Sequence, residues 1–557
     1  MKLYEDFMNE YFSLAPLSAT YIGINDYNDK LINYYEEPER IKYQNFLKKY
    51  ISLVNQKLKL SNTEKNKHYL KVLQYRLKMD LERYKYNFHY LPIDSLHNTI
   101  LNWVEHCSGK SYIPLKSMKD FKNFFSRMRV YLESIDSMIN RMKDGIKNKI
   151  TQPKKVMKKV LVDLENVLKN KDYLLNDYNS IKQDKIPKSV FVEYNLIIKK
   201  LFPLQIKKLS NFIQNTYLKN CHNGFGLLAF KNGKEMYNYL VRYHTTLKKP
   251  NIPEIHNLGI KEVGRIKENI NQLFIKYKKI YPNLINPKNM KDIKDIKVRE
   301  KIFYKDENDI LKSFRKLQIQ IDKYVLPKYF SINDKINTKY QIKRIPKFKE
   351  KNKGGAYYQR SSYNIKRLGT FYINIGKIDQ IYKCNSYSLS IHEGNPGHHF
   401  QTSYSNDMKN PLFISFYEDE TAYVEGWGLY AEYLGRQYLL EEEKEKELNE
   451  DQVYNLFGSY NMEMLRAIRL VIDTGIHYYG WDFKKSFNYM KKYSELGEKE
   501  MENEIYRYSL NPGQALAYKI GELKFKKMNE EAIKKGKNIK DFHHNVLKYG
   551  AKPLWML

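Results

Sequence analysis

The spacing of apolar residues along the first half of the chain predicts one amphipathic helix after another. Across 121–142, apolar side chains recur every three or four residues, which places them on one stripe of a helix. Gly145 is expected to end that helix. A second helix is predicted to begin near Thr151 and Pro153, because proline is tolerated in a first helical turn, and to continue to Leu168. Both stripes are interpreted as core-facing surfaces.

One later segment has a different period. In 368–376 (LGTFYINIG), the apolar residues Phe371, Ile373 and Ile375 alternate with more polar neighbours, which is the two-residue period of a half-buried β-strand. We expect this strand to lie along a substrate cleft and to offer backbone groups to an extended peptide.

Composition favours the same fold class, mainly α. Only 25 glycines and 17 prolines occur in 557 residues, which is few for a turn-rich β-protein. No repeat or low-complexity linker divides the chain. We therefore expect a single large domain, 1–557, with a mainly helical N-terminal part, 1–340, and a part that bears a candidate metal site, 341–557.

The formal charge of +34 would suit a nucleic acid or another polyanion as partner. However, the lysines are spread along the whole chain and form no basic stripe, and no nucleic-acid-binding motif is present. A basic nucleic-acid-binding protein without catalysis is therefore ranked last among the functions considered.

The sequence also predicts a compartment. Cys107, Cys221 and Cys384 are far apart and form no CxxC pair, which favours a reducing environment. Glu5 and Asp6 interrupt the apolar segment that a signal peptide would need, and no run of about 18 apolar residues occurs. We expect a cytoplasmic protein that does not enter the membrane.

The stretch SIHEGNPGHHFQ, 390–401, contains the residues best suited to chemistry. His392, His398 and His399 are potential neutral nitrogen ligands, and Glu393 supplies a carboxylate that can act as a base. A zinc-dependent hydrolase requires these groups.

A second stretch, YVEGWGLYAE, follows at 423–432. The apolar neighbours of Glu425, among them Val424 and Trp427, indicate that it is buried, where an unpaired carboxylate would be unfavourable. Glu425 is therefore a candidate for a third ligand.

These stretches, together with RLVIDTGIHYYGW (469–481), RYSLNPGQALAYKIG (507–521) and DFHHNVLKYGAKPLW (541–555), resemble the motifs of a known family. It is a largely bacterial family long described only as a domain of unknown function, whose members carry HExxPGHH and EGWxxYxE. The family is similar to helical zinc peptidases such as angiotensin-converting enzyme, thimet-type oligopeptidases and Taq-type carboxypeptidases. The resemblance extends from PLSATYIGINDY (16–27) to the C-terminus.

The resemblance implies a zincin-like fold, a large helical bowl with a deep cleft and a short edge β-sheet. It also implies a metallopeptidase in which His392, His398 and Glu425 hold Zn²⁺ and Glu393 is the general base. His399 is the runner-up for the second imidazole. Peptides are the expected substrates, with hydrolysis of a non-peptide amide or ester as the alternative.

Pro396 makes a regular helix incompatible with this ligand set. At about 100° and 1.5 Å per residue, His398 would lie roughly 240° around the helix from His392, and His399 about 10 Å along its axis. Proline also lacks the N–H of a helical hydrogen bond, and glycine permits unusual dihedrals. The sequence therefore predicts a break or bulge at 395–397.

Further candidates lie in the C-terminal motifs. Arg507 and Tyr518 belong to a family-like stretch and are expected to bind a substrate carbonyl or carboxylate. Arg469, Asp473 and His477 are four residues apart on one helical face, and we interpret them as a buried polar network that supports the site.

Overall fold

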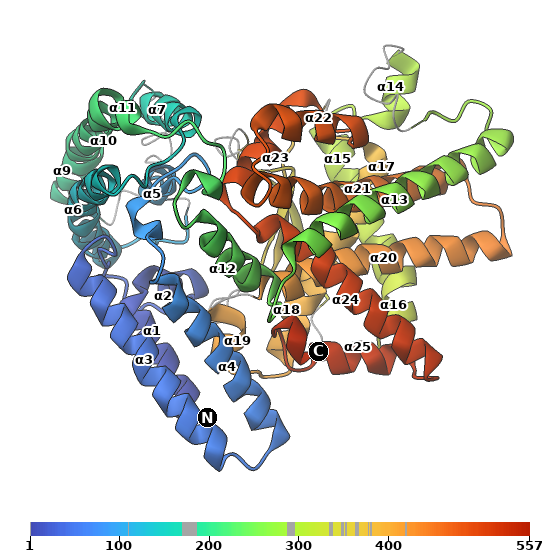
Figure 1. Cartoon of the computed structure of the whole chain (residues 1–557), viewed down its shortest axis with the longest axis horizontal. Helices are drawn as coiled ribbons and strands as arrows, with labels where there is room; N and C mark the ends of the chain where they lie inside the picture. The colour runs from blue at the N-terminus through green and yellow to red at the C-terminus, as the bar shows by residue number, and fades with distance from the viewer. Residues whose placement is uncertain are drawn as a thin grey trace. The chain divides into compact units, whose positions relative to one another are not determined.

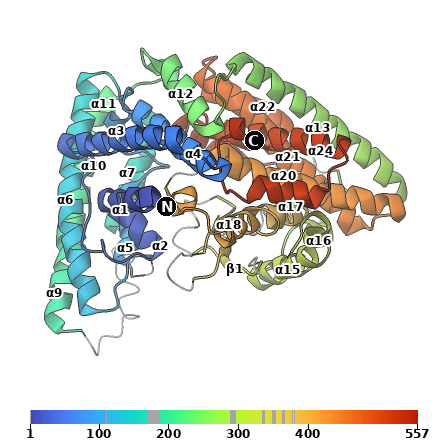
Figure 2. The same ribbon diagram turned by 90° about the horizontal axis from the view of Figure 1, so that it is seen from below.

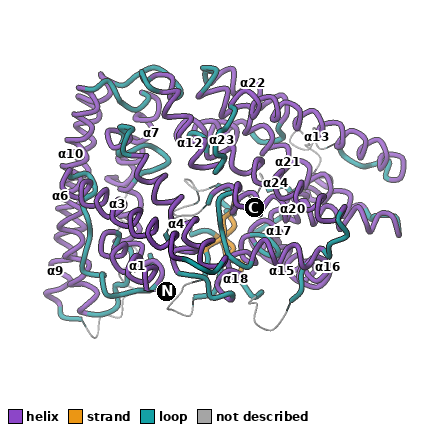
Figure 3. The backbone as a smooth tube through the Cα atoms, turned by 60° about the horizontal axis from the view of Figure 1, so that its bottom comes forward, coloured by secondary structure: helices purple, strands orange, loops and turns teal. Residues whose placement is uncertain are grey.

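Helices make up most of the computed structural model, and its only described sheet has three short strands (Figures 1 and 3). The fold class predicted from the sequence, mainly α, is confirmed. The structure describes residues 2–109, 111–169, 186–286, 296–332, 338–346, 350, 354–361, 367–376, 378, 381–417 and 420–557. Within these ranges, no helix has the length and apolar character needed to cross a membrane.

Contacts divide the chain into two compact units. The first contains the described residues up to Gly224 together with Ala229–Lys231, and the second contains Phe225–Leu228 and the described residues from Asn232 onward. This division does not coincide with the boundary at 340 expected from the sequence. Whether the two units fold together as a single domain is not decided by this division, so the single domain stays a prediction.

The described part of the first unit contains helices and connecting loops, and no strand of the sheet. Its helices are α1 (Lys2–Leu14), α2 (Pro16–Ile22), α3 (Glu37–Leu60), α4 (Glu64–Arg83), α5 (Thr99–Cys107), α6 (Met118–Lys147), α7 (Lys154–Lys169), α9 (Lys188–Leu196), α10 (Phe202–Phe212) and α11 (Leu218–Asn220).

The two helices predicted in this unit are present as α6 and α7, and the apolar stripe of α6 lies in the core. The predicted end of the first helix was wrong, because α6 continues past Gly145 to Lys147. A Cβ at Gly145 would lie 2.5 Å from the carbonyl oxygen of Ile150. The glycine thus permits a close approach of the chain after the helix and does not end it.

The second unit carries the sheet and the remaining helices. These are α12 (Gly233–Thr245), α13 (Ile252–Ile280), α14 (Ile296–Ile302), α15 (Glu307–Gln320), α16 (Leu326–Tyr329), β1 (Gln341–Arg344), β2 (Ala356–Gln359), β3 (Thr370–Ile373), α17 (Lys383–Glu393), α18 (His398–Asp407), α19 (Leu412–Phe416), α20 (Thr421–Glu445), α21 (Glu450–His477), α22 (Phe483–Tyr493), α23 (Glu498–Leu510), α24 (Gln514–Lys534) and α25 (Ile539–Leu547).

Long helices form the frame of this unit. α20 packs against α24, α13 packs against α21, and α17 contacts both α20 and α21 (Figure 2). α20 and α24 touch through their backbones, since a Cβ on Gly426 would lie 2.4 Å from the Cα of Gly521. Side chains on these helices are consequently held in fixed positions relative to one another.

A buried ionic network connects the same helices. Lys519 has no exposed side-chain surface, and its Nζ lies 3.0 Å from Glu262, 2.6 Å from Glu463 and 2.7 Å from Glu522. Glu463 also pairs with Arg436 at 2.8 Å. Opposite charges therefore compensate one another where water is excluded.

The strand order is β1-β3-β2, with β3 parallel to β1 and antiparallel to β2. The strand predicted in 368–376 is confirmed as β3. The prediction that this strand offers backbone groups to a peptide was wrong, because both sides of β3 are hydrogen-bonded to neighbouring strands. In the described sheet, the outer sides of β1 and β2 are the edges.

Candidate metal centre

The helix that carries His392 breaks where the sequence predicts. α17 ends at Glu393, α18 begins at His398, and the peptide bond between Asn395 and Pro396 is cis. The N–H of Gly397 turns back to donate to the carbonyl of Ile391 at 3.0 Å. The predicted break is confirmed, and it lets the two histidines approach from separate helices.

Close contacts fix the chain within this break. A Cβ on Gly397 would lie 2.1 Å from the carbonyl oxygen of His392, so no other residue fits there without moving the backbone. Asn395 donates to the carboxylate of Asp322 at 2.7 Å. The indole N–H of Trp427, on α20, donates to the carbonyl of Pro396 at 2.9 Å.

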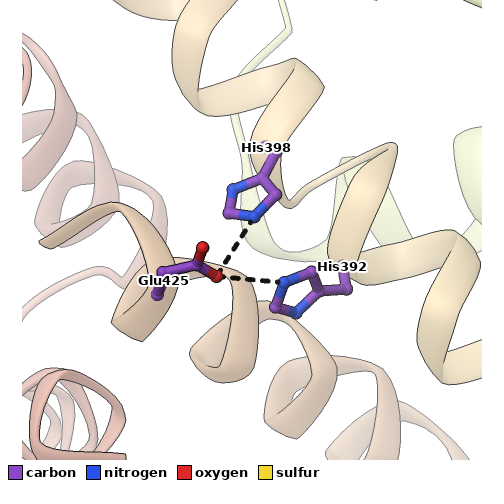
Figure 4. A group of neighbouring side chains, drawn as sticks. All are labelled: His392, His398 and Glu425. Atoms are coloured by element: carbon purple, nitrogen blue, oxygen red, sulfur yellow. Dashed lines mark ion pairs between the residues drawn. The ribbon is translucent and has the colours of Figure 1, made fainter. Parts of the chain in front are cut away.

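Three side chains converge beside the break (Figure 4). His392 and His398 each place Nε2 3.5 Å from the same carboxylate oxygen of Glu425. The three potential ligand atoms lie within 4.8 Å of one another. Two imidazole nitrogens and one carboxylate oxygen suit Zn²⁺, and they leave a position for water when the ion is four-coordinate. The donor set therefore fits the metal that the resemblance implies.

Glu432 orients the first histidine. The Nδ1–H of His392 donates to Glu432 at 2.7 Å, which leaves Nε2 directed at Glu425. Ser388 donates to the other oxygen of Glu432, and Arg466 lies 3.4 Å from the first. No role was predicted for Glu432 from the sequence, although its position two helical turns after Glu425 was a usable signal.

The carboxylates create a local field that favours positive charge. Burial lowers the pKa of His392, but hydrogen bonds to Glu425 and Glu432 outweigh burial and raise this pKa to about 10. Burial raises the pKa of Glu425, but the two histidines outweigh it and hold this pKa well below its usual range. The group is consequently anionic unless a proton or a cation compensates it.

The other two residues of the motif occupy different places. Glu393 is the last residue of α17 and is 7% exposed. Its negative charge lies close enough to His392 to raise the pKa of that histidine. His399 is buried outside the group of three, and its Nδ1 is hydrogen-bonded to the hydroxyl of Tyr358 at 2.9 Å. Tyr358 belongs to β2, so the sheet lies beside the motif.

The predicted network of Arg469, Asp473 and His477 is buried, and each residue bonds to another part of the chain. Arg469 donates to the hydroxyl of Tyr508 at 3.2 Å, and His477 donates to the backbone carbonyl of Tyr508 at 2.9 Å. The N–H of Gly513 donates to Asp473 at 3.0 Å. Together they fasten α21 to the segment that contains the other candidate residues.

Burial also shifts the protonation of this network. Burial raises the pKa of Asp473 to about 7, although Tyr237 and Gly513 donate hydrogen bonds to it. Burial lowers the pKa of His477 to about 4, so this imidazole is neutral at pH 7.

Arg507 and Tyr518 lie together, with Nη2 of Arg507 donating to the Tyr518 hydroxyl at 2.9 Å. Neither forms a hydrogen bond or an ion pair with His392, His398 or Glu425.

Gly428 is predicted to be indispensable for the position of His392. A Cβ at this position would lie 2.6 Å from Cε1 of the imidazole, so Gly428→Ala should displace the ring and lower zinc affinity by about 10–100-fold. A competition titration against a chromophoric chelator measures this change. Gly264→Ala is the matched control, because its methyl group would enter open space on α13. An unchanged affinity in Gly428→Ala would contradict the assigned geometry.

The sequence matches a known protein family. Residues 16–557 match the family described as "Bacterial protein of unknown function (DUF885)". No curated protein matches the chain.

Solved structures similar to this chain include the following two. The "putative lipoprotein" of Colwellia psychrerythraea is 18% identical, with a TM-score of 0.86 over 100% of this chain and 96% of that chain. The "putative lipoprotein of unknown function" of Shewanella oneidensis is 18% identical, with a TM-score of 0.73 over 99% of this chain and 97% of that chain. At these identities the likeness concerns the fold alone, and kinship with zinc peptidases stays a prediction. The match across nearly the whole sequence shows that the chain belongs to the bacterial family of unknown function DUF885.

Proposed function

We propose that the protein is a zinc-dependent hydrolase and that peptides are its substrates. The observation that supports this proposal is the convergence of His392, His398 and Glu425, whose ligand atoms lie within 4.8 Å of one another. Glu393 directly follows His392 in the sequence. Two imidazoles and one carboxylate are a ligand set of catalytic zinc sites.

Each residue of the site has a role in this proposal. Zinc held by His392, His398 and Glu425 would polarise a carbonyl and lower the pKa of a bound water. Glu393 accepts the proton of the attacking water and delivers it to the leaving nitrogen. Glu432 keeps the ring of His392 in place through its hydrogen bond to Nδ1.

The sheet supports a peptide as substrate. β2 is an edge strand, and its Tyr358 touches His399, the neighbour of His398. An extended peptide can add to such an edge through backbone hydrogen bonds. We therefore propose β2, and not β3, as the strand that binds the peptide. A deep cleft around the site is part of the same proposal.

Metal analysis tests the proposal directly. Protein purified without chelator is expected to contain about one zinc ion per chain by mass spectrometry, since a single ligand set of this kind is present among the described residues. Chelation should abolish cleavage of a peptide library, and added zinc should restore it. Protein that takes up no transition metal would disprove the proposal. If the protein takes up zinc but cleaves only esters or non-peptide amides, the zinc-dependent hydrolysis stands and the proposal of a peptide substrate is wrong.

We also propose a cytoplasmic location. The three cysteines Cys107, Cys221 and Cys384 are free thiols, which suits a reducing compartment. The two solved structures described above have "lipoprotein" in their names, which is a statement about those two proteins.

A further inference from the structure

Two arginines of the second unit share a single carboxylate. Nη2 of Arg469, on α21, lies 2.8 Å from Glu504, and Nη1 of Arg507 lies 3.4 Å from the other oxygen of the same side chain. Neither arginine forms an ion pair with another described carboxylate. This arginine cluster therefore has one positive charge in excess.

Arg469 has an unused donor. The residue is 5% exposed, and its Nε and Nη2 donate to Tyr508 and Glu504. Its Nη1 is buried and has no hydrogen-bond partner among the described residues. Buried guanidinium N–H groups are normally satisfied, and the acceptor that suits them best is a carboxylate or another planar anion.

Neighbouring groups give the cluster further donors and an approach from solvent. Arg507 bonds through Nη2 to Gln514 at 3.0 Å and to the Tyr518 hydroxyl at 2.9 Å. The guanidinium of Arg469 stacks on the ring of Tyr518, 4.5 Å from its centroid. The side chain of Arg507 is 28% exposed, so an anion from solvent can reach it.

Two structural routes connect the arginine cluster to the metal centre. Along α21, Arg469 follows Arg466 by three residues, about 4.5 Å along the axis, and Arg466 contacts Glu432. Along α24, Tyr518 precedes Gly521 by the same interval, and Gly521 touches Gly426, the residue after Glu425. The helices of Arg469 and Tyr518 thus pack against helices that carry candidate ligands, because α21 contacts α17 and α24 contacts α20.

We propose that this arginine cluster binds a carboxylate of the substrate, and that the hydrolase acts on peptides with a negative charge close to the scissile bond. The inference rests on the proposed function. Arg507 and Arg469 provide the cationic N–H donors, and Tyr518 provides a further hydroxyl. The carboxylate is either the C-terminus of the peptide or an acidic side chain.

Binding of small uncleaved probes tests this inference separately from catalysis. Isothermal titration calorimetry with zinc-free protein compares N-acetyl-Ala-Ala with its C-terminal amide, and N-acetyl-Ala-Glu-amide with N-acetyl-Ala-Gln-amide. At least one acidic probe should bind about tenfold more tightly than its neutral partner, because it gains a charge-assisted hydrogen bond. The pair that shows the difference identifies the source of the carboxylate. Because the protein is free of zinc, binding of the carboxylate to the metal cannot cause the difference.

Variants assign the effect to the cluster. Arg507→Gln should reduce the preference for the acidic probe to about one, and Arg507→Lys should retain part of it, since lysine keeps the charge but not the paired donors. Arg40→Gln is the matched control, because Arg40 also pairs with a glutamate three residues before it. Circular dichroism verifies that each variant is folded.

Equal binding of acidic and neutral probes to wild-type protein, or an unchanged preference in Arg507→Gln, would overturn the inference. Absence of zinc or of hydrolysis would instead refute the proposed function. The two failures are therefore distinguishable.

Discussion

Replacing Glu393 with Gln is expected to leave the zinc content unchanged and to lower peptide hydrolysis by about 10²–10⁴-fold. The amide has the size of the carboxylate but cannot accept the proton of the attacking water. Glu393 is outside the group of three converging ligand atoms, so the metal should remain bound. Single-turnover kinetics on zinc-loaded protein, together with metal analysis, measure both quantities.

Glu268→Gln provides a control for the same chemical change on the exposed surface of α13. It should affect neither zinc content nor turnover. If Glu393→Gln lost its zinc, Glu393 would be a ligand and the assigned roles would have to be exchanged.

Replacing His398 and His399 one at a time should show which of the two histidines binds zinc. His398→Gln is expected to lose zinc on dialysis, because its Nε2 faces the same oxygen of Glu425 as His392 does. His399→Gln should keep about one zinc ion per chain, because His399 is directed at Tyr358. Mass spectrometry of the dialysed proteins gives the stoichiometry.

Each variant replaces one buried or nearly buried imidazole, and the two positions are adjacent. Each variant therefore serves as a control for the other. Thermal unfolding followed by circular dichroism verifies the fold of each. Loss of zinc from His399→Gln with retention in His398→Gln would establish the runner-up ligand.

The fold was predictable where local pattern decides structure. α6 and α7 followed from apolar spacing, since the same side chains that form the stripe become the core. Contacts distant in sequence were not predictable. Gly145 permits a close approach to Ile150, and the central position of β3 depends on pairing with β1 and β2, which lie in stretches without a clear alternation.

The same division applies to the candidate site. The break at Pro396 followed from helix geometry, the properties of proline and glycine, and the ligand set that the resemblance implies. The structure brings His392 and His398 together at that break. Glu432 was missed, because a buried glutamate acquires a role only through a partner on another helix, here His392. Arg469 was assigned to a supporting network, and its unused donor became visible only with its surroundings.

The ionic network around Lys519 has a consequence for sequence divergence. Removing one member would leave the opposite charge buried without a partner, at a cost of about 3–5 kcal/mol, which is a large share of the 5–15 kcal/mol typical of a whole domain. Replacing all members together by apolar residues of similar volume is far less harmful. Relatives of this protein should therefore keep Lys519, Glu463 and Glu522 as a set or exchange them as a set, and these positions should covary in an alignment of the family.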